Sequence, residues 1–205
     1  MTESPIADYL VEHGVLKRNH SSEAGKALLE IQPSLADINY ESASKYMDMT
    51  WKKVEESHYS SSLNGQFFEL VLACVLIKEG IVPFYMGAEV QFVPNAKFDL
   101  LLYSEEFGPI VISAKTSLRE RYKQADLESF ALRAVYRRSR SFLVTLHSHE
   151  ADGVQKKIEK GDVTNLERVV IANEPGFDDL IAELKALTLI SAPTFTALVG
   201  GKEIN

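Results

Sequence analysis

The sequence of 205 residues lacks several features that would each point to a class of protein. It has one cysteine, Cys74, which excludes a disulfide framework and a zinc site built from several cysteines. We expect a buried thiol in a reducing cytosol. No apolar run reaches the roughly 20 residues of a membrane-spanning helix, because the longest, from Phe67 to Ile77, is about half that length. No basic region followed by an apolar one opens the chain, so we expect no signal peptide.

A net positive charge is also missing. The formal net charge is −7 and the pI is about 5.3, which argues against a nucleic-acid-binding protein, because these usually carry a basic footprint. The charge is uneven, however: the segment from Lys115 to Arg140 has a net charge of +5, and the remainder has −12. A local basic strip on an acidic body can follow a phosphate backbone. The alternative is a solvated helix face.

The remaining composition, 45% hydrophobic and 25% charged residues, is that of a globular protein. Up to about residue 60, apolar residues recur at three- to four-residue spacing, which predicts helices. From residue 89, short β-type runs alternate with helical stretches. This order predicts an α/β fold with a central mixed β-sheet flanked by helices. We expect residues 1–60 to form an N-terminal helical appendage and residues 61–205 the core, in one compact domain.

The expected elements follow from this periodicity and from the Gly and Pro residues between them. Helices are predicted at residues 7–15, 22–31, 40–56, 63–79, 118–136, 154–159 and 177–187. Strands are predicted at residues 89–93, 98–103, 110–115, 141–147 and 168–172. The apolar tail from Thr188, which contains Pro193, receives no assignment.

A carboxylate interrupts one of the predicted strands. Asp99 follows Phe98 and precedes three leucines in a strand that is apolar on both faces, where an unpaired charge is costly. The next strand is almost entirely apolar up to Ser113 and Lys115, which point to the same face because they are two residues apart. A hairpin through residues 104–109 brings the end of this strand beside the start of the previous one. We therefore expect Asp99 and Lys115 to be neighbours; a purely structural ion pair is the alternative.

Two further carboxylates stand out on predicted helices. Glu128 lies seven residues after Arg121, so the two differ by only about 20° around an α-helix, with Gln124 between them. This stripe begins shortly after Lys115 and is expected to face the same end of the sheet, although a solvent-exposed ion pair is the alternative. Glu69 is the only charged residue in residues 66–77, a helical stretch apolar on every side. It is either paired with the N-terminal helices or part of a site.

Together these residues predict a magnesium site with an adjacent lysine. Asp99, Glu128 and Glu69 offer the oxygen ligands that Mg²⁺ prefers, and Mn²⁺ is expected to substitute. A metal ion next to the ammonium group of Lys115 suits phosphodiester hydrolysis, because both stabilise charge that develops on the phosphoryl group.

The same residues resemble the signature of the PD-(D/E)XK nuclease superfamily, an acid on one strand and an acid-x-Lys motif on the next. Here Phe98-Asp99 is followed by Ser113-Ala114-Lys115, so Phe98 replaces the usual Pro and Ser113 replaces the usual acid. The run from Lys115 to Glu128 resembles type II restriction endonucleases of the EcoRII and NgoMIV group, in which the following helix supplies the missing acid. The resemblance covers about residues 62–150.

The resemblance implies a restriction-endonuclease-like sheet and a role for each candidate residue. Lys115 is the implied catalytic lysine, Asp99 and Glu128 are the implied metal ligands, and Arg121 is an implied active-site support. Glu69 matches a glutamate that this group often carries on an early helix, acting on a second metal ion or through water. The residues expected to meet DNA phosphates are Arg119, Lys123, Arg133 and Arg137.

The implied function is Mg²⁺-dependent cleavage of double-stranded DNA by a sequence-specific type II restriction endonuclease. Two subunits cut the two strands of a palindromic site, so a homodimer or higher homo-oligomer is expected. A cognate methyltransferase in the same system, a cytoplasmic location in a prokaryotic or phage context and no membrane association are also expected. One alternative is a nicking or less specific repair or phage nuclease with the same core. The other is an inactive DNA-binding module, for which Ser113 would mark a decayed site.

Overall fold

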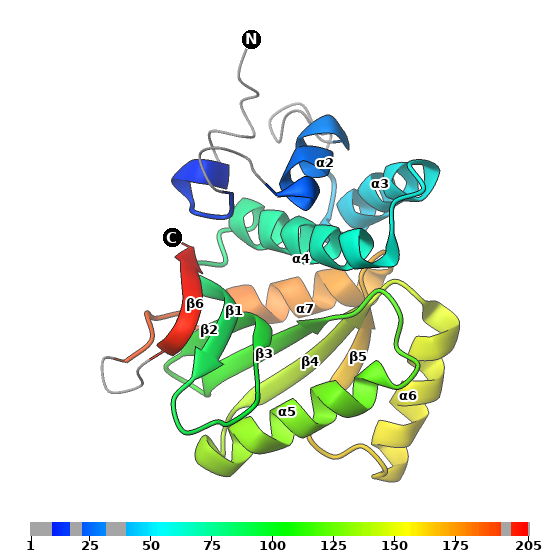
Figure 1. Cartoon of the computed structure of the whole chain (residues 1–205). Helices are drawn as coiled ribbons and strands as arrows, with labels where there is room; N and C mark the ends of the chain where they lie inside the picture. The colour runs from blue at the N-terminus through cyan, green and yellow to red at the C-terminus, as the bar shows by residue number, and fades with distance from the viewer. Residues whose placement is uncertain (1–9, 17–21, 32–39, 194–197, 205) are drawn as a thin grey trace.

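The computed structural model of the protein describes residues 10–16, 22–31, 40–193 and 198–204 (Figure 1). Its helices are α2 (Glu23–Ile31), α3 (Ala43–Glu56), α4 (Ser61–Lys78), α5 (Arg121–Val135), α6 (Ser148–Lys160) and α7 (Pro175–Lys185). Its strands are β1 (Phe84–Val90), β2 (Phe98–Ser104), β3 (Gly108–Ala114), β4 (Arg140–Thr145), β5 (Arg168–Ile171) and β6 (Leu198–Ile204).

The strands form one six-stranded mixed sheet in the order β5-β4-β3-β2-β1-β6. β1, β2 and β3 form an antiparallel meander, and β6 pairs antiparallel with β1. β4 and β5 continue the sheet in parallel, each reached through a helical crossover. Helices lie on both faces (Figure 1), so the predicted α/β class with a flanked mixed sheet is confirmed.

Successive side chains of each strand point to opposite faces of the sheet, so the hydrophobic core has two sides. Leu100 and Leu102 of β2 face the side covered by α4 and α7, where one large hydrophobic cluster lies. Leu101 and Tyr103 face the opposite side, where Leu132 of α5 joins a second cluster. Burial on both faces explains why β2 and β3 read as continuous apolar runs in the sequence.

The helices that precede residue 60 share the core of the sheet domain. α2 packs on α4, and α3 packs on α7. Leu28 of α2 and Met47 of α3 are fully buried in the same cluster as the apolar residues of α4. Residues 10–16 also contribute Leu10 to this cluster, whereas the remainder of the predicted 7–15 helix lies outside the described residues.

α4 is the only described helix that is long and apolar enough to cross a membrane by length and composition, and 56% of it is buried inside the protein. A core helix of a soluble protein passes the same test. Its place over β2 and β3 accounts for its apolar sequence, because it contacts the sheet on one side and α2 on the other.

Three element boundaries differ from the sequence prediction. β1 spans Phe84–Val90, so the expected strand at residues 89–93 was placed about five residues too late. α6 begins at Ser148 rather than near residue 154. The unassigned tail supplies β6, the edge strand next to β1. β1 and β6 lie over 100 residues apart in the chain, and such a long-range pairing leaves no local signal in the sequence.

Candidate active site

Asp99 and Lys115 meet where the β2–β3 hairpin opens. The antiparallel register pairs Leu100 with Ile112, which brings the first residues of β2 beside the last residues of β3. Asp99 Oδ2 accepts hydrogen bonds from Lys115 Nζ at 2.5 Å and from the backbone N–H of Ala114 at 2.8 Å. The two side chains are only 16% and 12% exposed. The expected neighbourhood of Asp99 and Lys115 is therefore present, and the lysine offsets the cost of the half-buried carboxylate.

Glu128 brings a second carboxylate to this region from α5. Its side chain is 9% exposed, and its Oε1 accepts a hydrogen bond from Gln124 Nε2 at 2.8 Å. Burial raises the pKa of Glu128, and the negative charge of Asp99 adds to this rise, whereas the Gln124 hydrogen bond and Lys115 oppose it. The predicted stripe of α5 therefore faces the end of the sheet at Gln124 and Glu128.

Glu69 brings a third carboxylate from α4, on the other side of the sheet end. Burial raises its pKa to about 7, and the nearby charge of Asp99 contributes to the rise. Lys115 and Lys97 act in the opposite direction. Asp99 therefore acts electrostatically on both Glu69 and Glu128, and Lys115 interacts with all three carboxylates.

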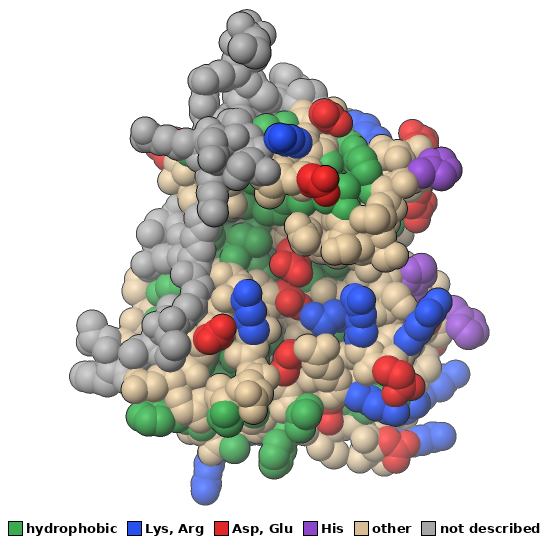
Figure 2. Space-filling view, in the orientation of Figure 1, with side chains coloured by type: hydrophobic (Ala, Val, Ile, Leu, Met, Phe, Trp, Pro, Cys, Tyr) green, Lys and Arg blue, Asp and Glu red, His purple; other side chains and the backbone are tan. Residues whose placement is uncertain are grey.

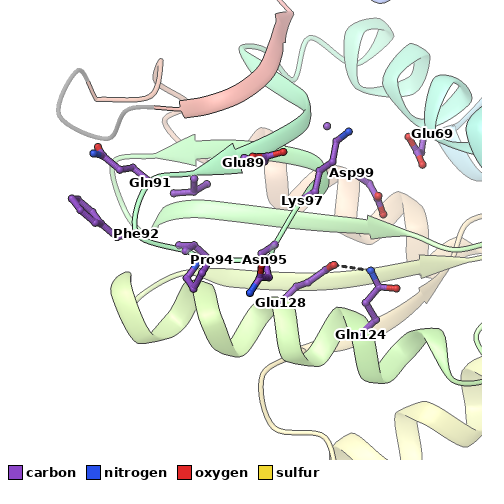
Figure 3. A pocket seen from close by; sticks show the side chains of 14 residues that line it. Glu69, Glu89, Gln91, Phe92, Pro94, Asn95, Lys97, Asp99, Gln124 and Glu128 are labelled. Atoms are coloured by element: carbon purple, nitrogen blue, oxygen red, sulfur yellow. Dashed lines mark hydrogen bonds between the residues drawn. The ribbon is translucent and has the colours of Figure 1, made fainter.

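These three carboxylates line one open cavity of about 1100 Å³. They project into it from α4, β2 and α5 (Figure 3). Figure 2 shows this region as a hollow between the upper helical layer and the layer of the sheet and α5. Acidic side chains lie inside the hollow, and Lys and Arg side chains lie along its lower edge in this view. This face therefore differs in charge pattern from the acidic molecule as a whole.

The segment that follows Lys115 is held in place by α6. Glu150, in the first turn of α6, accepts hydrogen bonds from the backbone N–H of Leu118 and from the Ser117 hydroxyl. Leu118 is buried and packs with Ala151 in a third hydrophobic cluster. These contacts fix the short connection from β3 to α5, so they position Lys115 relative to Glu128. Sequence reasoning missed Glu150, because its partner segment lies about 30 residues earlier in the chain.

Lys97 is a further cavity residue that the sequence analysis did not single out. It lies two residues before Asp99, at the end of the connection that leads into β2, and it is exposed. Its stem passes over Gly87 of β1, which has a φ of +59°. A Cβ at Gly87 would lie 3.2 Å from Lys97 Cε, so glycine provides both the backbone conformation and the room for the lysine.

The predicted basic residues do not gather at the cavity. Arg121, in the first turn of α5, is exposed and is absent from the described residues that line the cavity. Lys123 forms an exposed ion pair with Glu120, and Arg133 donates a hydrogen bond to the carbonyl oxygen of Thr164. The other two predicted phosphate contacts, Arg119 and Arg137, are exposed beyond either end of α5. The roles assigned to these five residues stay predictions.

The donor set around the cavity is suitable for a hard divalent cation. Asp99, Glu128 and Glu69 provide carboxylate oxygens only, which is the chemistry that Mg²⁺ prefers. Burial and mutual repulsion raise the pKa values of Glu69 and Glu128, and a bound cation would relieve both effects. Within the described residues, however, no three His, Cys, Asp or Glu side chains form a ready-made metal site. Binding would therefore require these side chains to move closer together.

Comparisons with known proteins give no match for this chain, whether with protein families, with curated proteins or with solved structures.

Proposed function

We propose that the protein is a Mg²⁺-dependent endonuclease of double-stranded DNA, and specifically a type II restriction endonuclease. The observation that carries the proposal is the interaction of one partly buried lysine, Lys115, with carboxylates from three different elements around one cavity. An acid at the start of one strand and a lysine at the end of the next is the arrangement expected from the PD-(D/E)XK signature. Glu128 lines the same cavity as Asp99, which supports the proposal that it replaces the acid missing at Ser113.

Each residue has a distinct part in the proposed reaction. Asp99 and Glu128 would hold the metal ion, with Glu69 opposite them. A bound Mg²⁺ supplies Lewis-acid polarisation of the phosphoryl group and a more acidic water. Lys115 carries a fixed positive charge next to Asp99, where it stabilises negative charge that develops on the phosphate oxygens. Gln124 orients Glu128 through its hydrogen bond.

A DNA digest tests the proposal directly. Purified protein is incubated with unmethylated phage DNA in Mg²⁺ and, separately, in EDTA, and the products are separated on a gel. We expect discrete bands in Mg²⁺ only, and we expect Lys115→Ala to lower the cleavage rate by about 100-fold or more. Lys52→Ala is the matched control, because Lys52 forms an exposed ion pair on α3 with Asp48. Full Mg²⁺-dependent cleavage by Lys115→Ala would contradict the proposal.

Two other readings make different predictions in the same digest. A smear or nicked circles would indicate a less specific or nicking nuclease with the same core. Intact DNA together with no binding of Mg²⁺ or Mn²⁺ would favour an inactive DNA-binding module. The absence of a ready-made metal site in the described residues favours this module, whereas the position of Glu128 beside the same cavity as Asp99 favours the enzyme.

A further inference from the structure

The loop between β1 and β2, residues 91–97, forms one wall of the candidate active-site cavity. The loop is anchored to the hydrophobic core, because Val90, Val93 and Ala96 are buried in the cluster that also contains Leu101 of β2. A backbone hydrogen bond from Val93 N–H to the Val90 carbonyl closes a tight turn. The loop is therefore held at several points, and the direction of the side chains between these anchors is fixed.

Phe92 lies between the buried residues Val90 and Val93. It is exposed to solvent and has an unfavourable backbone conformation. Its side chain is 75% exposed, the largest exposure among the large hydrophobic residues of the described chain. Its φ is +66°, in the left-handed region that a bulky residue rarely adopts and that glycine or asparagine adopts more easily. A single exposed apolar residue is ordinary. An exposed aromatic ring that is also held at a strained residue calls for a functional reason, because strained residues concentrate at binding and active sites.

The surroundings of Phe92 indicate the chemistry of its partner. Phe92 lines the same cavity as Asp99, Glu128 and a further carboxylate, Glu89, and in Figure 3 it lies at the end away from Asp99 and Glu128. Besides Phe92, the exposed side chains of the loop are Pro94, the amide of Asn95 and the ammonium group of Lys97. An aromatic face, an amide and a cation on one loop match the three parts of a nucleotide: the base, its polar edge and its phosphate.

We propose that Phe92 is a nucleic-acid contact, whose ring stacks against a base next to the phosphodiester held at Asp99 and Lys115. The inference rests on the proposed function and adds to it the residue that engages a base. Aromatic and apolar side chains unstack base steps when they insert into DNA, and every base offers a π-face to an aromatic ring. The strained backbone keeps the ring ready for this contact before DNA arrives.

Equilibrium binding tests this inference without depending on cleavage. Fluorescein-labelled duplexes of mixed sequence, either fully paired or with one mismatch, are titrated with the full-length protein in Ca²⁺, and anisotropy is measured. We expect Phe92→Ala to weaken binding roughly 5- to 100-fold and Phe92→Trp to preserve it. The wild type is expected to prefer the mismatched duplex, whose bases unstack at lower cost, and Phe92→Ala is expected to lose this preference.

Two further variants keep the test independent of folding defects. Phe92→Gly removes the ring but suits a positive φ, so it should weaken binding as Phe92→Ala does while melting no lower than the wild type. Phe130→Ala is the matched control, because Phe130 is 57% exposed on α5 and does not line this cavity. It should bind both duplexes as the wild type does.

The outcomes separate this inference from the proposed function. If the wild type binds DNA but cleaves none in Mg²⁺, the proposed function fails, and the Phe92 variants still decide the inference. If the wild type cleaves and Phe92→Ala binds both duplexes as tightly as the wild type, the inference fails alone. Loss of a dimer on gel filtration by Phe92→Ala, with unchanged DNA affinity, would also overturn it and assign the ring to contact with a second copy. Absence of any DNA binding by the wild type overturns both.

Discussion

A single lysine, Lys115, interacts with all three carboxylates of the candidate site. Lys115 pairs with Asp99 and opposes the rise in the pKa values of Glu69 and Glu128, to which the charge of Asp99 contributes. Removal of the lysine leaves these acids without their closest cation, and it is therefore the change expected to disturb the site most. The residues that matter are charged groups at positions where the surrounding sequence is apolar.

Glu69 makes stability depend on pH in an unusual direction. Its pKa is raised from 4.5 to about 7 in the folded protein, by burial first and by Asp99 second, against the effects of Lys115 and Lys97. Below about pH 4.5 the carboxyl group is protonated in both the folded and the unfolded states. Between about pH 4.5 and 7 the unfolded state loses this proton and the folded state keeps it, so stability falls as the pH rises.

Between pH 5 and pH 8, we therefore expect the free energy of unfolding of the wild type to fall by up to about 3 kcal/mol more than that of Glu69→Gln. Urea unfolding of both proteins in EDTA measures the free energy of unfolding at each pH. Glu55→Gln is the matched control, because Glu55 is exposed on α3 and should keep the wild-type profile. An identical pH dependence for Glu69→Gln and the wild type would contradict the raised pKa.

At the scale of elements, α7 ties α3 to the sheet domain. Asp178 of α7 accepts hydrogen bonds from the backbone N–H of Ser44 at 2.8 Å and from its hydroxyl at 2.5 Å. Ser44 lies in the first turn of α3, so the carboxylate meets unpaired N–H groups and the positive end of the helix dipole. The helices before residue 60 are joined to the core by this contact as well as by apolar packing.

Asp178→Ala is expected to lower the free energy of unfolding by about 1–2 kcal/mol, because it removes two charge-assisted hydrogen bonds at a helix N-terminus. Asp179→Ala is a close control, since Asp179 is the next residue of α7 and is exposed. Denaturant titrations followed by circular dichroism compare the two variants. Equal stabilities would show that apolar packing alone holds α3 in place.

At the scale of the whole molecule, the protein is acidic, but it carries a basic margin, a row of Lys and Arg side chains along one side of the acidic cavity (Figure 2). The formal net charge is −7, whereas Lys and Arg side chains lie along the lower edge of the hollow in Figure 2. Such a margin can guide a polyanion to the cavity even though the total charge opposes it. Glu69, Asp99 and Glu128, which line the cavity, would hold the divalent cation of the proposed function.

Binding of Mg²⁺ should therefore stabilise the fold. With Mg²⁺ at about 100-fold above its Kd, we expect the melting temperature of the wild type to rise by roughly 5–10 °C. Glu128→Gln should lose most of this rise, because it removes a negative ligand while keeping the hydrogen bond with Gln124 possible. Thermal unfolding in NaCl of equal ionic strength is the control. An undiminished rise in Glu128→Gln would place the ion elsewhere on the protein.

Much of the fold was predictable from local patterns. The apolar runs of β2 and β3 and the turn at residues 104–109 predict a hairpin, and the hairpin is enough to bring Asp99 to Lys115. The seven-residue spacing on α5 placed Glu128 toward the same end of the sheet. Arg121, at the other end of that spacing, is exposed, whereas its neighbour Tyr122 is the residue of the first turn of α5 that is buried.

The sequence by itself determined which charged residues stand in apolar surroundings, because period-2 and period-3.6 patterns are local and each fixes the face of one element. Only the tertiary structure decided how the elements assemble: the pairing of β6 with β1, the wall that residues 91–97 build beside Asp99, and the strained exposure of Phe92. These features depend on contacts between distant segments and on backbone conformations that such contacts impose. Burial between α4, β2 and α5 likewise raises the pKa values of Glu69 and Glu128, and no local pattern encodes that burial.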